Sequence, residues 1–246
     1  MVRVSGLMDQ VDAGVTTSPD GLHSPAQLLD QVRADVLKIM MESRDCFIRD
    51  LLPALASHGV TVYSYADLDA AQRKRVNTYF REIIFPILTP LAFDPGRPFP
   101  HISNLSLNLA ITIQDKKGVQ RFARLKIPGT VSQLVPVNAP GANARRRSAE
   151  ATLGFVLIEE VIIANLGTLF PGMKVLEAHP FHVTRDADME IQELEASDLL
   201  ETVEESVRQR RFGNVVRLQV NDRMPDDVLQ ILLTNMNVDA VDVYRL

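Results

Sequence analysis

The stretch FHVTRDADMEIQELEASDLLETVEESVRQRRFG, residues 181–213, decides the fold of this chain. Phe181 and Val183 alternate with polar residues as in a β-strand, and residues 184–188 predict a turn into a long helix. Apolar residues at helical spacing on that helix are Leu194, Leu199, Leu200, Val203 and Val207. Acidic residues dominate its first part and arginines its last turn, an order that complements the helix dipole. Gly213 is expected to end the helix in a left-handed conformation.

The composition is that of an ordinary globular protein, with 46% hydrophobic and 23% charged residues in a chain of 246. This length can bury a sizeable core, in one large domain or in two smaller ones. The net charge of -5 argues against nucleic acid as the main partner of the surface. A single cysteine, Cys46, excludes an internal disulfide and fits a reducing, cytoplasmic location. No apolar run approaches the length of a membrane span, and Asp9 and Asp12 interrupt any signal peptide.

The first 57 residues predict a helical segment. Ser24 can cap a helix, Pro25 suits its first position, and Gln27 can close a capping box, so a strong helix start is expected here. Apolar residues that continue at helical spacing are Leu29, Val32, Val36, Ile39, Met40 and Phe47. Pro53 and then Gly59 are expected to close this region, so we place a domain boundary after residue 57.

Residues 60–63 predict a short strand, and Asp67 is expected to cap the helix that follows. Pro86 should end that helix. Residues 85–95 are rich in proline and also apolar. We expect them to form an ordered, extended connector, because apolar side chains are costly to leave in water.

The clearest strand is Leu105–Ile113, where apolar and mostly polar residues alternate, so one face should be buried. A turn at Asp115–Gly118 and a returning strand at residues 122–127 predict an antiparallel hairpin. Further strands are expected at residues 134–137, 216–220 and 241–246, and helices at residues 155–166 and from Pro225 onward. Strands and helices mix without regular alternation. This favours an α+β fold, with a helical N-terminal segment before a mixed α+β domain.

Three acids on the predicted turn, Asp186, Asp188 and Glu190, could be ligands of a hard cation. They also lie where the dipole of the following helix favours negative charge, so we interpret them as helix caps. Arg185 is expected to pair with one of them. His179 and His182 fall on a strand and should face opposite ways, so a zinc site is not expected there.

Three consecutive arginines, Arg145, Arg146 and Arg147, are the best candidate for contact with a polyanion such as polyphosphate. Guanidinium groups bind phosphate oxygens in pairs, and a loop can present several together. The alternative is an ordinary solvated loop, which is common for such clusters. Cys46 is interpreted as a packing residue. No set of nucleophile, base and acid emerges, so the residues alone indicate no catalytic, cofactor-binding or metal site.

Several phrases, taken in order, resemble long-type bacterial polyphosphate kinases. They are VRVSGL at residues 2–7, FPILTPL at 85–91, PFP at 98–100, NLSLNL at 104–109, FAR at 122–124, LFPG at 169–172 and the stretch from residue 181 to residue 220. Several motifs in the same order are far more specific than any one of them, and the likeness covers essentially the whole chain.

The resemblance implies a function and a domain plan. Enzymes of this family transfer the terminal phosphate of ATP reversibly to polyphosphate through a phosphohistidine. They have a helical N-terminal domain, a head domain involved in dimerisation and two domains similar to phospholipase D. The catalytic histidine and the magnesium ligands belong to those last two domains, which this sequence does not contain. The family's ATP-contacting phrase, Asn-Asn-Leu-Asp-Glu-Phe, would lie just before Met1.

The resemblance therefore identifies residues 1–57 as the end of the N-terminal domain and residues 58–246 as the head domain of a polyphosphate kinase fragment. No catalytic, ATP-binding or metal residue of the family can be carried onto a position of this sequence. ATP and magnesium are expected as partners of the full-length enzyme only. The chain itself is expected to be a scaffold and dimer surface, inactive alone; the alternative is a stand-alone dimerisation or polyphosphate-binding module without enzyme activity.

Overall fold

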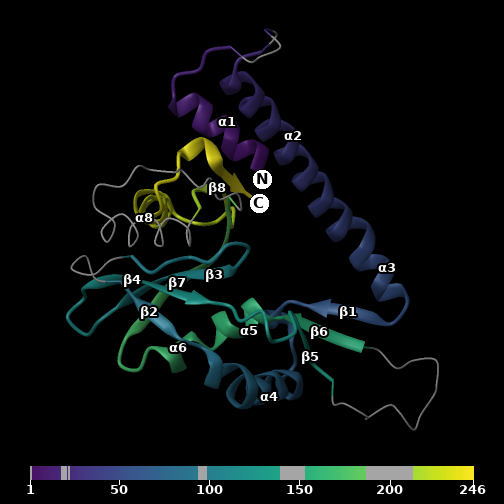
Figure 1. Cartoon of the computed structure of the whole chain (residues 1–246). Helices are drawn as coiled ribbons and strands as arrows, with labels where there is room; N and C mark the ends of the chain where they lie inside the picture. Colours follow the sequence, from purple (N-terminus) through teal and green to yellow (C-terminus); the bar gives the residue numbers. More distant parts are fainter. Residues whose placement is uncertain (1, 18–20, 22, 94–98, 139–152, 187–212) are drawn as a thin grey trace. The chain divides into compact units, whose positions relative to one another are not determined.

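The computed structural model describes residues 2–17, 21, 23–93, 99–138, 153–186 and 213–246 (Figure 1). They form two compact units. Unit 1 combines residues 1–40, 101–106 and 182–246, and unit 2 combines residues 41–100 and 107–181. Each unit therefore draws on stretches that are far apart in the sequence. Within the described residues, no helix has both the length and the apolar character needed to cross a membrane.

Unit 1 begins with helix α1 (Val2–Asp12) and takes in most of helix α2 (Pro25–Cys46). The start of α2 is the predicted capping box. The Ser24 backbone N–H donates to Gln27 Oε1 at 2.9 Å, and the Gln27 N–H donates to Ser24 Oγ at 3.1 Å. These bonds satisfy two donors that the first turn of a helix leaves without partners, so the sequence prediction is confirmed.

In unit 1, the strands have the order β7-β8-β9. Only the last residues of β7 (Lys174–Arg185), from His182 onward, belong to this unit. β8 (Val215–Val220) pairs in parallel with β9 (Val243–Arg245). Helix α8 (Asp226–Met236) and the 3-10 turn η5 (Ala240–Asp242) connect the two strands. α8 starts with two acids and buries Val228, Leu229 and Leu232. The strand predicted at residues 216–220 and the helix predicted after Pro225 are confirmed.

In unit 2, one sheet has the strand order β2-β4-β3-β7. β3 (Leu107–Gln114) and β4 (Gln120–Lys126) form the predicted antiparallel hairpin. Its turn is closed by the Asp115 N–H, which donates to the Val119 carbonyl at 3.0 Å. Gly118 has a φ of 84°, a conformation that glycine adopts without steric cost.

The other sheet of unit 2 has the order β1-β6-β5, with β6 (Leu153–Leu157) in the centre. β1 (Val60–Tyr63) pairs with it in parallel, and β5 (Leu134–Pro136) pairs with it antiparallel. The prediction of a single buried helix over residues 155–166 is therefore wrong. The chain makes β6 first and then helices α5 (Ile158–Ala164) and α6 (Leu166–Leu169). A continuous apolar run fits a central strand as well as a buried helix, and its periodicity does not separate the two.

The helical part of unit 2 corrects two boundaries. Pro53 does not close the first region but lies in the first turn of α3 (Leu52–Ser57), directly after the π-helical turn η1 (Phe47–Leu51). The chain is helical without a break from Pro25 to Ser57, and a π-helical turn is one of the places where a helix accommodates a residue that cannot donate to the preceding turn. The chain turns instead at Gly59, whose φ is 77°.

Helix α4 (Ala70–Tyr79) is capped by Asp69, not by Asp67. The Gln72 N–H donates to Asp69 Oδ1 at 2.8 Å, and the Asp69 N–H donates to Gln72 Oε1 at 3.0 Å. Asp67 belongs to the preceding 3-10 turn η2 (Tyr65–Asp67). The expectation failed because both aspartates are good caps and only Asp69 has a glutamine three residues later.

The segment after α4 is more structured than the expected connector. It continues as the π-helical turn η3 (Phe80–Ile84), the 3-10 turn η4 (Phe85–Ile87) and strand β2 (Pro90–Ala92), which pairs antiparallel with β4. Residues 94–98 of the predicted connector lie outside the described residues.

The core of unit 2 lies between these sheets and helices α4 and α5. Fully buried members include Val76, Phe80, Leu109, Ile111, Leu125, Val156 and Ile162. Strand β3 is buried on both faces, whereas alternation predicted one polar face. Asn108 and Ala110 are both completely buried, and Asn108 Oδ1 accepts from Arg124 Nε at 2.9 Å. The polar partner on β4 is what allows the amide into the core.

Candidate functional site

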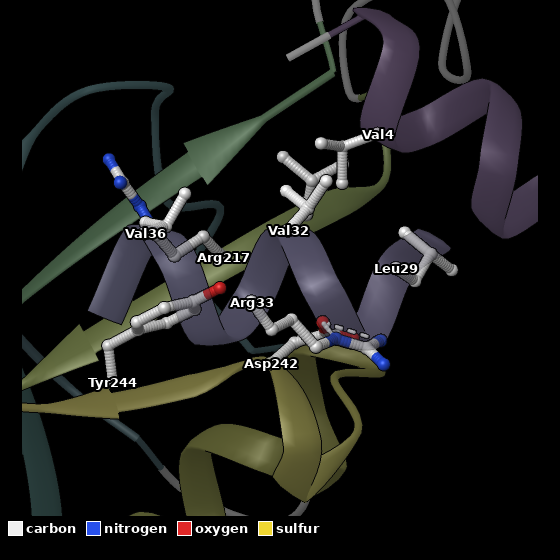
Figure 2. Close-up of a pocket in the computed structure, with 9 residues that line it drawn as sticks. Val4, Leu29, Val32, Arg33, Val36, Arg217, Asp242 and Tyr244 are labelled. Carbon is white, nitrogen blue, oxygen red and sulfur yellow. Dashed lines mark hydrogen bonds and ion pairs between the residues drawn. The ribbon is translucent and has the colours of Figure 1, made fainter. Parts of the chain in front are cut away.

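A small pocket in unit 1 is the candidate site (Figure 2). Its lining comes from α1, α2, β8, η5 and β9, and the residues are Val4, Leu29, Val32, Arg33, Val36, Val216, Arg217, Asp242 and Tyr244. The space is about 30 Å³. That is enough for one or two water molecules and far too little for a nucleotide. Its lining combines aliphatic side chains with two arginines, an aspartate and a tyrosine.

Arg33 and Asp242 form the central interaction of this pocket. Arg33 Nε and Nη2 both lie 2.8 Å from Asp242 Oδ1, and Arg33 Nη1 lies 3.2 Å from Asp30 Oδ1. Asp242 is only 2% exposed, because η5 carries it inward between Val241 and Val243. Burial raises the pKa of the Asp242 carboxyl, and the hydrogen bond and charge of Arg33 oppose that rise.

Tyr244 lies on β9, two residues after Asp242, and is 7% exposed. Burial raises the pKa of the Tyr244 phenol, and the nearby Asp242 carboxylate raises it further. The Tyr244 hydroxyl is therefore protonated at neutral pH and available as a hydrogen-bond donor. Figure 2 shows its hydroxyl directed toward the side of the pocket where Arg33 and Asp242 meet.

Arg217 contributes its stem to the pocket, while its guanidinium points away from the ion pair (Figure 2). Its Nη2 donates to Thr184 Oγ1 at 3.1 Å, and its Nη1 lies 3.8 Å from Met40 Sδ. Burial lowers the pKa of the Arg217 guanidinium. The pKa of His182 on β7 is lowered first by burial and then by the positive charge of Arg217. Arg217 and His182 are thus electrostatically linked.

Both histidines lie on strand β7, as expected. His179, in unit 2, lies 2.9 Å from Glu177 Oε2 through its Nε2, and Thr112 Oγ1 donates to Glu177 Oε1 at 3.2 Å. His182 belongs to unit 1. Within the described residues, no group of three or more histidine, cysteine, aspartate or glutamate side chains is placed to hold a metal ion.

Arg185 donates to two backbone carbonyls: Nε to Ile102 and Nη1 to Gly213, each at 2.8 Å. Two of the three acids with which it was expected to pair, Asp188 and Glu190, lie outside the described residues, so that pairing stays a prediction. Gly213 itself passes so close to Asp186 that an added Cβ would lie 2.3 Å from the Asp186 carbonyl oxygen. Close backbone approach thus requires a glycine here. The left-handed conformation expected at Gly213 is wrong, because Gly213 is not among the described glycines with a positive φ. The helix that it was expected to end lies outside the described residues.

Other predicted residues have mixed outcomes. Cys46 is exposed, so its interpretation as a packing residue is wrong. The arginine cluster Arg145–Arg147 and two of the three turn acids, Asp188 and Glu190, lie outside the described residues. The Asp186 N–H donates to the Asn214 carbonyl at 2.9 Å. Neither Cys46 nor Asp186 lines the pocket of unit 1.

The residues of this pocket were missed at the level of sequence. Arg33 and Asp242 are 209 positions apart, so no spacing rule connects them. One local signal was available: Asp242 stands between two valines in a segment expected to be a strand. An acid in such a place either faces solvent or is buried with a partner. Chemically, the residues that line this pocket can bind a small group and hold it in position. They place no nucleophile beside a base.

Comparison with known proteins agrees with the motifs. Residues 1–63 match the N-terminal domain of polyphosphate kinase, and residues 71–246 match its middle domain. A crystal structure of polyphosphate kinase from Porphyromonas gingivalis matches 99% of this chain and 32% of its own, with a TM-score of 0.75 at 21% identity. That likeness shows the fold.

Closer relatives in sequence carry the same name. Polyphosphate kinase 1 of Chlorobaculum tepidum is 44% identical over 248 residues, covering 100% of this chain and 35% of the relative. Polyphosphate kinase of Mycobacterium tuberculosis H37Ra is 42% identical over 247 residues, covering 99% and 33%. The chain belongs to the polyphosphate kinase family. It spans about a third of the length of these relatives.

Proposed function

We propose that this chain is the end of the N-terminal domain and the head domain of a polyphosphate kinase, an enzyme that transfers the terminal phosphate of ATP reversibly to polyphosphate through a phosphohistidine. The observation that carries this proposal is the match of two polyphosphate kinase domains, in order, to residues 1–63 and 71–246. The named relatives and the α+β fold support it.

Within that enzyme the chain acts as a scaffold and dimerisation region. The described residues place no nucleophile beside a base, and the pocket of unit 1 is too small for a nucleotide. ATP and magnesium then act outside the part of the enzyme that these residues form, and the single cysteine, Cys46, fits a cytoplasmic location. The 246-residue chain is accordingly inactive by itself.

The first experiment measures phosphotransfer by the purified chain. Incubation with ATP, Mg²⁺ and a polyphosphate primer should give no change in polyphosphate length, while the full-length Chlorobaculum tepidum enzyme, run in parallel, should give one. Any turnover by the chain alone would overturn the proposal that it is inactive by itself.

A chimera tests whether the chain performs the scaffold role. The aligned third of the Chlorobaculum tepidum enzyme is replaced by this chain, which is 44% identical to it. We expect the chimera to keep measurable polyphosphate synthesis and the oligomeric state of the parent, as measured by sedimentation. A well-folded chimera that is inactive and monomeric would contradict the proposal.

The alternative function is a stand-alone module that dimerises or binds polyphosphate without enzyme activity. The feature that favours binding is the run Arg145, Arg146 and Arg147. Replacing all three by alanine should weaken polyphosphate binding and reduce its dependence on salt, because fewer counterions are released. A matched control removes the same charge at exposed sites elsewhere, Arg49, Lys116 and Lys117. Equal binding by both variants would count against this module.

A further inference from the structure

Four cations lie close together on helix α4 and on the turn that follows it, in unit 2. Arg73, Lys74 and Arg75 belong to α4, Arg81 belongs to η3, and all four residues are exposed. Between residues 70 and 84 the sequence has a single acid against these four cations, although the net charge of the chain is -5. This helix therefore carries a local excess of positive charge.

Backbone carbonyls and an aromatic ring hold Arg73 in place. Its Nη2 donates to the carbonyls of Ala66 and Leu68, each at 3.0 Å, and its guanidinium lies over the Tyr65 ring, 5.6 Å from the centre. These partners carry no net charge. They fix the position of the guanidinium without neutralising it, and its remaining N–H groups stay available as donors.

The other two arginines are held in the same way. Arg75 Nη1 donates to the Val137 carbonyl at 3.3 Å. Arg81 Nε donates to the Asn77 carbonyl at 3.3 Å, and its Nη2 donates to Thr78 Oγ1 at 3.4 Å. All three guanidinium groups are thus positioned by neutral acceptors, and each has more N–H groups than these bonds use.

No acid compensates the charge of the cluster. Within the part of the chain that the structure describes, none of the four cations forms an ion pair. Asp69 accepts from a backbone N–H at the start of α4, and Glu82 is exposed on η3 without an ion pair. Lys74 and Arg81 share one face of the helix, because Thr78 Oγ1 donates to the Lys74 carbonyl and accepts from Arg81 Nη2.

We propose that this α4 cluster, made of Arg73, Lys74, Arg75 and Arg81, is a binding surface for polyphosphate. Guanidinium groups bind phosphate oxygens in pairs, and preplaced donors lose little freedom on binding. The helix rises about 12 Å between residues 73 and 81, long enough for contact with more than one phosphate of a chain. The choice of polyphosphate among phosphate polyanions rests on the proposed function.

RNA, another phosphate polyanion, fits this surface less well. Proteins hold single-stranded nucleic acid largely by stacking its bases on exposed aromatic rings. The Tyr65 ring beside the cluster packs against the core of unit 2 and has Arg73 over it, and its hydroxyl donates to Asn77 Oδ1 at 2.9 Å. The cluster thus offers charge and N–H donors, which suit a ligand made of phosphate alone.

The test measures the binding of end-labelled polyphosphate to the 246-residue chain by fluorescence anisotropy at several salt concentrations. Lys74→Gln/Arg81→Gln removes two exposed charges from the cluster. We expect Kd to rise about tenfold and the slope of log K against log salt to flatten by about one to two, because fewer counterions are released. Binding equal to that of the wild-type chain would overturn the proposal.

Two control variants separate the cluster from total charge and from fold. Lys116→Gln/Lys117→Gln removes the same charge at the exposed hairpin turn of unit 2 and should change Kd by less than about twofold. Lys74→Arg/Arg81→Lys keeps both charges and should restore binding. A loss as large in the hairpin variant as in the α4 variant would show that only total charge matters.

Two further arms identify the source of the binding. If alanine at Arg145, Arg146 and Arg147 abolishes binding and the α4 variant does not, the α4 proposal is overturned. The chimera test of the proposed function is independent of that result. An RNA oligomer with a matched number of phosphates should bind more weakly than polyphosphate at the same salt concentration. Tighter binding of the RNA would overturn the assignment to polyphosphate.

Discussion

At the scale of single residues, Asp242 shows what a buried charge requires. Its carboxylate is held by Arg33, whose side chain is 21% exposed, and burial still raises the pKa of the acid. Desolvation thus outweighs the attraction of the partner, which is common for ion pairs inside proteins. We therefore expect the pair to contribute specificity of packing between α2 and η5 more than net stability.

The first prediction distinguishes the net contribution of the Arg33–Asp242 pair to stability from the destabilisation caused by removing one partner. Arg33→Met leaves Asp242 buried without a cation and should destabilise the chain by about 3 kcal/mol in urea unfolding. The double variant Arg33→Met/Asp242→Leu should recover most of that loss, since an apolar pair needs no solvation. Arg49→Met, at a side chain 75% exposed, is the control and should change little. A double variant as unstable as the single one would contradict the expectation that an apolar pair can replace this ion pair.

The second prediction concerns His182 and pH. Its pKa is lowered from the ordinary 6.5, first by burial and then by the Arg217 charge, although a hydrogen bond with the Leu105 backbone opposes the shift. The folded state therefore prefers neutral His182, while the unfolded chain takes up a proton as pH falls below 6.5. The stability due to this residue is present above pH 6.5 and is lost as pH falls through the folded-state pKa.

The measurement is the free energy of unfolding between pH 8 and pH 5. His182→Gln should flatten the loss of stability below pH 6.5 relative to the wild-type chain. His23→Gln, at an exposed histidine, should leave the slope as it was. Identical slopes for the wild-type chain and His182→Gln would show that another group carries the pH dependence.

At the scale of elements, helix caps are the features that local sequence predicts best. Ser24 and Gln27 form the expected box, because all its partners lie within four residues. The cap of α4 was misplaced by two residues, at Asp67 instead of Asp69, because both aspartates suit the role and the glutamine three residues after Asp69 was not taken into account. Sequence thus predicts that a helix starts more securely than it predicts the residue at which it starts.

The third prediction tests the observed cap. Asp69→Ala removes the acceptor for the Gln72 N–H and should lower stability by about 1 kcal/mol. Asp67→Ala is the matched control, two residues away in η2, and should cost clearly less. The measurement is urea unfolding of the two variants. An equal or larger loss of stability for Asp67→Ala would contradict the assignment of Asp69 as the cap of α4.

The fourth prediction concerns Gly154 in the central strand β6. A Cβ at this position would lie 2.4 Å from Val137 Cγ2 and 2.8 Å from Tyr63 Cε2. Gly154→Ala should therefore destabilise unit 2 by about 2 kcal/mol through overpacking. Val137→Ala in the same chain should relieve part of that loss, because it removes the nearest clashing atom. A neutral Gly154→Ala in thermal unfolding would argue against the close packing of β5 and β6.

At the scale of the whole molecule, family domains and compact units divide the chain differently. The match to the N-terminal domain ends at residue 63, and the match to the middle domain starts at residue 71. Unit 1 nevertheless combines residues 1–40 with residues 182–246. The domain boundary predicted after residue 57 concerns the family's domain plan and stays a prediction. In the folded chain, most of α2 belongs to unit 1.

The fifth prediction follows from this division. Deleting residues 1–40 removes α1 and most of α2 and exposes Val216 and Tyr244, which line the pocket with them. Amide hydrogen exchange in β8 should become faster by at least tenfold, whereas β3 and β4, in unit 2, should keep their protection. Unchanged protection of β8 would show that residues 182–246 fold without the first helices.

The sequence by itself determined the local features and the family. The capping box at Ser24, the hairpin turn at Asp115–Gly118 and the order of the family motifs are set by residues close together in the chain. Such features depend only on backbone geometry and on neighbouring residues, so the sequence alone predicts them.

The tertiary structure alone decided which distant residues meet. It paired Arg33 with Asp242, gave β6 two strands as neighbours where a helix was expected, and buried both faces of β3. The reason is that burial depends on which segments the folded chain brings together. Spacing along one segment carries no information about the partner that a charge or an apolar run will find.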